Sequence, residues 1–324
     1  MEGAFLYNPE GSGQGAHGSC LLETHEGDLL VCWYAYPDRE TADGRIVLAR
    51  KFRGRPEWEK SRLLFPELQA SAGNPLVVEH APSGSLELYF VVLRGTYWTD
   101  SIMYYSVSLD RGYTWTRPAV AYDQPGLMLR HAPVSWGSDG WLLPAYDERT
   151  NRTVLLTGRG DSWEEHYCFD APLIQPALVA LNELEMVLLL RPVGDPYVIW
   201  RSATTTAGRR WSAPCQTTLP CPLSGIDAFS HPQGIAVVYN HSTAHQRTPL
   251  SLSTSEDGGV SWHGPYHLES LPFELSYPSF LLGSDGAAHG VFTYNRKMIK
   301  YVRVSLSELF TSSAAAGSPE TEAA

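Results

Sequence analysis

The sequence of 324 residues lacks long hydrophobic runs, a basic excess and a cysteine pattern. No apolar stretch is long enough to cross a membrane, and the first eighteen residues have neither the basic start nor the apolar core of a secretion signal. The five cysteines are scattered, with no spacing typical of a zinc site. Asp and Glu outnumber Lys and Arg by 35 to 24, which argues against nucleic acid or an anionic membrane as a partner. We therefore expect a soluble, cytoplasmic protein that requires no metal or organic cofactor.

No segment shows sustained helical periodicity, whereas one short turn signature recurs along the chain. Residues Ser108–Trp115 read S-x-D-x-G-x-T-W, and Ser255–Trp262 repeat the pattern with Ser in place of Thr. Three weaker copies are Arg53–Trp58, Arg159–Trp163 and Ala207–Trp211. The tryptophans that end the copies are 48 to 57 residues apart, and a period near fifty with strands between is typical of β-propeller blades.

The signature predicts architecture rather than a ligand site. Its Asp accepts hydrogen bonds from backbone N–H groups of the turn, its Gly takes a positive φ, and its Trp packs between blades. We expect one all-β domain over residues 1–310, a six-bladed propeller in which the residues before His17 pair with the last blade and remove a free edge. Residues 311–324 are predicted to be a disordered tail. The six blades are expected at about 17–58, 74–115, 132–163, 175–211, 227–262 and 277–306.

The turns and their spacing resemble those of the sialidase (neuraminidase) superfamily, which has Asp-box or BNR repeats, and in particular the bacterial predicted neuraminidases. The resemblance covers the chain from about residue 17 to 306. It implies a six-bladed propeller whose substrate lies over the central axis. It also implies a Tyr nucleophile with a Glu base, a separate Asp as acid and base, and three arginines that bind a carboxylate.

Three positions match the residues that this resemblance implies. The segment Asp38–Ile46 resembles the loop of the proton donor, for which Asp43 is the first choice and Glu40 the second. Tyr277 matches the nucleophile. A neutral phenol approaches an anionic sugar more easily than a carboxylate does, which is the chemical reason for a Tyr in this role. Arg191, at the end of an apolar run, matches the second arginine of the carboxylate site.

Other positions depart from the pattern. The base Glu is replaced by Gln175, a neutral amide that cannot take a proton from the phenol. Glu274 lies three residues before the Tyr, but strand alternation predicts that it points to the other face. His17 stands where the first arginine is expected. The third arginine aligns near Ser253, and Arg247, six residues earlier, is a substrate-binding candidate that could reach the site by another route.

Arg130 and Arg296 are further basic candidates, each beside a blade boundary or a strand end.

With one of three arginines clearly in place, the sequence favours an exo-glycoside hydrolase acting on a glycan at the axis, and not a typical sialidase. One alternative is a non-catalytic glycan-binding propeller that uses Trp98, Asn240 and His241. Another is a polysaccharide lyase in which Tyr277 and His17 move the proton. Composition leaves the oligomeric state open.

Overall fold

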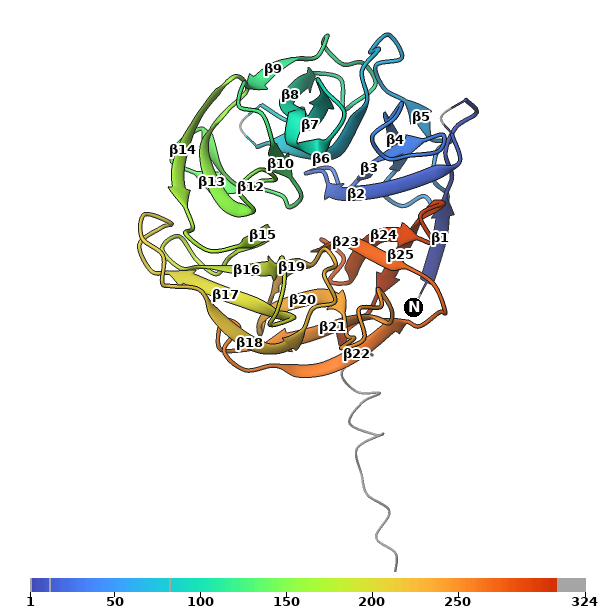
Figure 1. The fold of residues 1–324 in the computed structure, drawn as a ribbon. Coiled ribbons are helices and arrows are strands. Elements are labelled where there is room, and N and C mark those ends of the chain that lie inside the picture. The colour runs from blue at the N-terminus through green and yellow to red at the C-terminus, as the bar shows by residue number, and fades with distance from the viewer. Residues whose placement is uncertain (1, 12, 82, 308–324) are drawn as a thin grey trace, which may run out of the picture.

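The computed structural model describes residues 2–11, 13–81 and 83–307, which form six antiparallel sheets. Figure 1 shows these sheets arranged as blades around a central axis, with the chain entering each blade in sequence order. The predicted all-β, six-bladed propeller is therefore confirmed. The predicted tail over 311–324 lies outside the described residues.

Within each blade the strands run from the axis to the rim in sequence order, except that the last blade ends on the N-terminal strand. The first three blades contain β2 (Gly15–Glu23), β3 (Leu29–Tyr36), β4 (Arg45–Lys51) and β5 (Arg62–Leu63); β6 (Ala72–His80), β7 (Ser85–Leu93), β8 (Ser101–Ser108) and β9 (Ala119–Tyr122); and β10 (Leu127–Leu129), β11 (Val134–Trp136), β12 (Gly140–Asp147), β13 (Arg152–Arg159) and β14 (Ser162–Cys168). A short 3₁₀ helix, η1 (Trp98–Asp100), precedes β8.

The other three blades repeat the arrangement. They contain β15 (Leu173–Ala180), β16 (Met186–Pro192), β17 (Val198–Thr204) and β18 (Cys215–Pro220); β19 (Asp227–His231), β20 (Gly234–Asn240), β21 (Leu250–Ser255) and β22 (His263–Glu269); and β23 (Leu275–Leu282), β24 (Ala288–Tyr294), β25 (Met298–Val304) and β1 (Glu2–Leu6).

The N-terminal strand closes the ring. β1 pairs antiparallel with β25, from Glu2 opposite Arg303 to Leu6 opposite Ile299. This confirms the expectation that residues before His17 complete the last blade. The pairing satisfies backbone groups that would otherwise form an exposed sheet edge.

The second strand of each blade is buried along almost its whole length, because neighbouring blades cover both of its faces. Every residue of β3 and of β7 is buried, without alternation between core and solvent. A continuous apolar run is the expected pattern for a strand that is enclosed on both sides.

The turn signature lies between the third and fourth strands of a blade. Asp110 accepts hydrogen bonds from the backbone N–H of Thr114 (2.8 Å) and from the hydroxyl of Ser108 (2.8 Å). The indole of Trp115 donates to the carbonyl of Gly112 (3.1 Å). The fourth strand therefore follows the tryptophan, and the blades extend beyond the boundaries expected from the sequence. The signature marks the last turn of the blade rather than its end.

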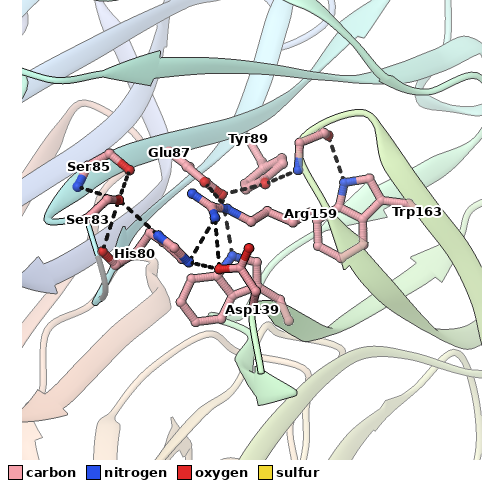
Figure 2. A network of polar contacts seen from close by, with 10 residues as sticks. His80, Ser83, Ser85, Glu87, Tyr89, Asp139, Arg159 and Trp163 are labelled. Atoms are coloured by element: carbon pink, nitrogen blue, oxygen red, sulfur yellow. Dashed lines mark hydrogen bonds and ion pairs between the residues drawn. The ribbon is translucent and has the colours of Figure 1, made fainter. Parts of the chain in front are cut away.

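The weak copy at 159–163 has Leu156 and Gly158 at the positions of the signature's Ser and Asp, and a hydroxyl of the neighbouring blade accepts the glycine N–H that the Ser hydroxyl accepts in the full copy. The N–H of Gly160 donates to the hydroxyl of Tyr89 (2.9 Å), which itself donates to Glu87 (2.7 Å). Figure 2 shows Arg159 between Glu87 and Asp139 in this network, which joins the second and third blades. Glu87 is 2% exposed, so the seam contains a buried carboxylate that is fully paired.

No helix in the described part of the chain is both long and apolar enough to span a membrane. Among the same residues, no group of three or more His, Cys, Asp or Glu side chains is arranged to hold a metal ion. All five cysteines are free thiols, and Cys20 and Cys32 are buried as expected.

Candidate functional site

Four innermost strands carry a bulge near their N-terminal end. Each bulge contains a residue with positive φ, and these residues are Gly18 (60°), Asn74 (45°), Gln175 (48°) and Tyr277 (53°). Positive φ is strained for a residue with a side chain, and bulges often redirect a side chain beside a functional site. Proline follows the positive-φ residue in three of the four bulges. This recurring X-Pro pair is a sequence signal that the motif analysis missed.

The bulges bring Gln175 of the fourth blade and Tyr277 of the sixth blade together. The amide Nε2 of Gln175 donates to the phenol oxygen of Tyr277 (3.1 Å) and to that of Tyr146 (3.3 Å). Its Oε1 accepts from Nη1 of Arg191 (2.8 Å). Because a guanidinium has no acceptor, this contact fixes which end of the amide faces the phenol. Gln175 therefore donates to Tyr277 and cannot accept its proton.

Three arginines lie beside Tyr277. The guanidinium carbons of Arg130 and Arg247 are 5.2 and 5.6 Å from the centre of its ring, and Arg191 reaches it through Gln175. Burial raises the pKa of the phenol, but the charges of Arg191 and Arg247, the hydrogen bond from Gln175 and the charge of Arg130 together hold this pKa below its usual value. The phenol is thus prepared for ionisation without a carboxylate base.

His17 packs against the same phenol, with ring centroids 4.2 Å apart. Its Nδ1 is 2.9 Å from the hydroxyl of Thr293. Burial, together with the charges of Arg296, Arg247 and Arg130, lowers the pKa of His17 well below its usual value. The imidazole is therefore neutral at pH 7 and adds no positive charge where the resemblance implies an arginine.

Glu274 lies at this site, although alternation predicted that it points away. Its carboxylate pairs with Arg247 (3.0 Å) and with Arg296 (2.8 Å), which occupies both oxygens. It precedes the first residue of β23 and the bulge at Ser276, so simple alternation does not describe its direction. Because two guanidinium groups hold this carboxylate, it is poorly suited to replace the missing base.

The two candidate acids of residues 38–46, Asp43 and Glu40, lie in different surroundings. Asp43 is exposed and pairs with Arg45 (3.2 Å), which is not one of the arginines beside Tyr277. Glu40 forms an ion pair with Arg296 and accepts a hydrogen bond from the hydroxyl of Tyr34 (3.4 Å). Glu40, the second choice from the sequence, is therefore the acid that Arg296 and Glu274 connect to Arg247 beside Tyr277.

Arg247, and not a residue near Ser253, lies beside Tyr277. Ser253 lies buried in β21, where its hydroxyl contacts that of Tyr239 (3.1 Å). Arg247 reaches Tyr277 instead, held by Glu274 and by the carbonyl of Leu223 (3.1 Å).

Three other candidates make contacts that do not include Tyr277. Asn240 donates to the carbonyl of Leu275 (2.8 Å), which joins the fifth and sixth blades. Trp98 packs edge-on against Tyr34 at 6.0 Å, and Nδ1 of His241 contacts the hydroxyl of Tyr239 (2.8 Å).

The opposite half of the axis is different in character. A cavity of about 530 Å³ is lined mainly by apolar residues from all six blades, and no residue of the Tyr277 cluster lines it. His131 and Asp227 form a buried ion pair in its wall (2.7 Å). Burial lowers the pKa of His131, but the charge of Asp227 outweighs it and raises that pKa overall. The arginines beside Tyr277 thus lie outside this cavity, whose wall is mainly apolar apart from the His131–Asp227 pair and Glu79.

A family model for a BNR repeat-like domain matches residues 27–289. No curated protein sequence matches the chain. Among solved structures, a Hadza microbial sialidase has a TM-score of 0.79 at 15% identity, covering 92% of this chain and 67% of its own. The NanB sialidase of Streptococcus pneumoniae has a TM-score of 0.78 at 11% identity, covering 94% and 70%.

The intramolecular trans-sialidase of Ruminococcus gnavus has a TM-score of 0.73 at 13% identity, covering 92% of this chain and 96% of its own. At such identities the likeness concerns the fold. The family match extends over most of the sequence, from the first blade to the last. This protein therefore belongs to the BNR repeat-like domain family and has the six-bladed fold of the sialidases.

Proposed function

We propose that this protein is an exo-glycoside hydrolase that acts on a carboxylate-bearing terminal sugar of a glycan, and that it is not a typical sialidase. The observation that carries the proposal is the contact of Tyr277 with Gln175 inside a group of arginines. A phenol with a lowered pKa is a nucleophile, and an amide in the place of the base is a departure from the sialidase pattern.

The arginines support an acidic sugar rather than a neutral one. Arg130 and Arg247 join Arg191 beside Tyr277, although only Arg191 matched an arginine that the resemblance implies. The Nε atoms of Arg130 and Arg191 are buried and have no hydrogen-bond partner within the described chain. Donors left in this way are costly unless a ligand satisfies them, and a sugar carboxylate has the matching acceptors.

The reaction follows from these positions. The phenol oxygen of Tyr277 attacks the anomeric carbon, and the glycosidic C–O bond breaks. Asp43, or Glu40 after release from Arg296, protonates the departing oxygen. Neutral His17, whose ring centroid is 4.2 Å from that of Tyr277, accepts the phenol proton. Water then cleaves the bond between the sugar and Tyr277 and restores the phenol.

A panel of aryl glycosides tests the proposal on the full chain. It includes a sialoside, another ulosonic acid, a uronide and neutral hexosides, each with wild type, Tyr277→Phe and the control Tyr301→Phe. We expect turnover of an acidic glycoside other than the sialoside, lost in Tyr277→Phe and kept in Tyr301→Phe. Strong sialoside turnover that depends on Tyr277 would contradict the proposal.

Two observations favour other readings. Oε1 of Gln175 is already occupied by Arg191, which suits a propeller that binds an acidic glycan without cleaving it. Calorimetric binding without product over long incubation would identify that function.

The close packing of His17 on Tyr277 suits a lyase, which would produce a sugar with a new, ultraviolet-absorbing double bond.

A further inference from the structure

A second positively charged pocket lies at the seam between the first and second blades. Its central residue is Arg50 in β4, which is 4% exposed. Its guanidinium lies over the rings of Tyr113 (4.5 Å) and Phe52 (5.5 Å). It makes no hydrogen bond or ion pair with any described residue, and its Nε and Nη1 are buried. A buried guanidinium is costly when it is unpaired, and ring contacts offset only part of this cost.

The equivalent seam between the fourth and fifth blades shows how such an arginine is normally satisfied. Arg201 lies on the third strand of its blade, as Arg50 does, and faces the turn signature of the next blade. Its Nε donates to the carbonyl of Gly258 in that turn (2.6 Å). Arg50 faces the turn at Gly112 but donates nothing to it.

Arg62 explains the difference. It comes from β5 at the rim and donates to the carbonyls of Tyr113 (2.8 Å) and Gly112. The turn of the second blade is therefore held by Arg62, and the guanidinium of Arg50 is left without a structural acceptor. The first seam thus contains one more arginine than its turn uses.

Arg50 and Arg62 line a surface cavity of about 340 Å³ together with Lys60, Tyr113, Glu59 and Leu48. Three of these side chains are cationic and one is anionic, in a protein whose net charge is −11. Lys60 is exposed and forms no ion pair with a described residue. The pocket is therefore locally positive against an acidic background.

We infer that this pocket binds an oxyanion group, such as a sulfate, phosphate or carboxylate, between Arg50, Lys60 and Arg62. A guanidinium presents several donors in a rigid fork that matches two oxygens of such a group, and an ammonium adds a point charge. The pocket shares no residue with the Tyr277 cluster, so it is a separate site. The group comes either from a free anion or from an acidic saccharide, and both present the same oxygens.

Titration calorimetry of the full chain tests this inference. The probes are inorganic sulfate, inorganic phosphate, a sulfated monosaccharide and its unsulfated parent, at ionic strength held constant with chloride. We expect saturable binding of the oxyanions and none of the unsulfated sugar. Arg50→Gln and Lys60→Gln should each weaken binding about tenfold or more, because each removes a charged donor. Tighter binding of the sulfated sugar than of sulfate would identify a saccharide as the source.

Two controls keep the result specific. Arg201→Gln should bind the oxyanion like wild type, because it removes an arginine from the matching seam. Tyr277→Phe should also bind like wild type, which separates this inference from the proposed hydrolase. Lys60 is exposed, so Lys60→Gln remains decisive if Arg50→Gln does not fold. The absence of saturable binding in wild type, or unchanged affinity in Lys60→Gln, would overturn the inference.

Discussion

Two tyrosines in this protein, Tyr89 and Tyr277, have opposite electrostatic surroundings. At the seam of Figure 2, Tyr89 donates its hydroxyl to the carboxylate of Glu87, and burial together with that negative charge raises the pKa of Tyr89. At the axis, the amide of Gln175 donates to Tyr277, and arginines outweigh burial to lower the pKa of Tyr277. A carboxylate beside a phenol keeps its proton in place, whereas an amide with guanidinium groups favours its loss.

The two regions also differ in how completely their donors are paired. Arg159 contacts Glu87, His80 and Asp139, so its charge is used within the protein. Arg130 and Arg191 each keep an Nε without a partner among the described residues. A closed network stabilises a seam between blades, and an open one leaves donors for a ligand. The following predictions test this distinction.

The largest effect is expected from Tyr277→Phe. The proposed nucleophile is lost, so kcat/KM on the best acidic glycoside should fall by about 10³-fold or more, which corresponds to about 4 kcal/mol of transition-state stabilisation. The thermal unfolding midpoint should change little, because the arginines keep other partners. Retained turnover in this variant would remove Tyr277 from the mechanism.

Glu87→Ala, at the seam between the second and third blades, is expected to lower stability and to leave ligand affinity almost unchanged. Arg159 and Tyr89 lose their buried acceptor, and the free energy of unfolding should fall by about 3 kcal/mol. Denaturant titration measures this change, with the more exposed Glu79→Ala as a control. The affinity of the folded variant for the axial ligand should stay within twofold of wild type. A variant as stable as wild type would show that the network does not hold the seam.

A smaller effect concerns the acid side of the stability profile. The pKa of His17 is lowered in the folded protein, so below its ordinary value of about 6.5 the unfolded chain binds a proton that the folded chain excludes. Stability should therefore fall as the pH falls below this value, by up to about 1.4 kcal/mol per pH unit from this group. His17→Asn should make the profile flatter between pH 5 and pH 7 in denaturant titrations. A slope equal to that of wild type would contradict the assignment.

The smallest expected effect is a change in the titration of Tyr277. Arg191→Gln removes the largest of the charges that lower its pKa, so ionisation should move to higher pH. The difference in absorbance between wild type and Tyr277→Phe isolates this phenolate, and the same subtraction in the Arg191→Gln background measures the shift. Tyr89 should not ionise within the range of the folded protein. Movement toward lower pH would show that Arg191 does not act on the phenol.

Local signals in the sequence were sufficient for the fold, whereas Gln175 and Tyr277 were singled out by the family resemblance. Asp110 and Trp115 bond within their own turn, so eight residues encode the feature that repeats around the ring. Gln175 and Tyr277, a neutral amide and a phenol, lie near the N-terminal ends of β15 and β23. In the structure these two side chains are joined by a hydrogen bond of 3.1 Å.

The sequence by itself determined the number of blades, because turns and apolar strands depend on hydrogen bonds and burial over a few residues. Only the tertiary structure decided that Arg247 rather than a residue near Ser253 reaches Tyr277, and that Glu40 pairs with an axial arginine. It also decided that Arg62 takes the turn and leaves Arg50 unpaired. The physical reason is that a guanidinium reaches a partner on another blade only through the ring geometry and the bulges that turn each strand, and neither is written in the spacing of residues along one strand.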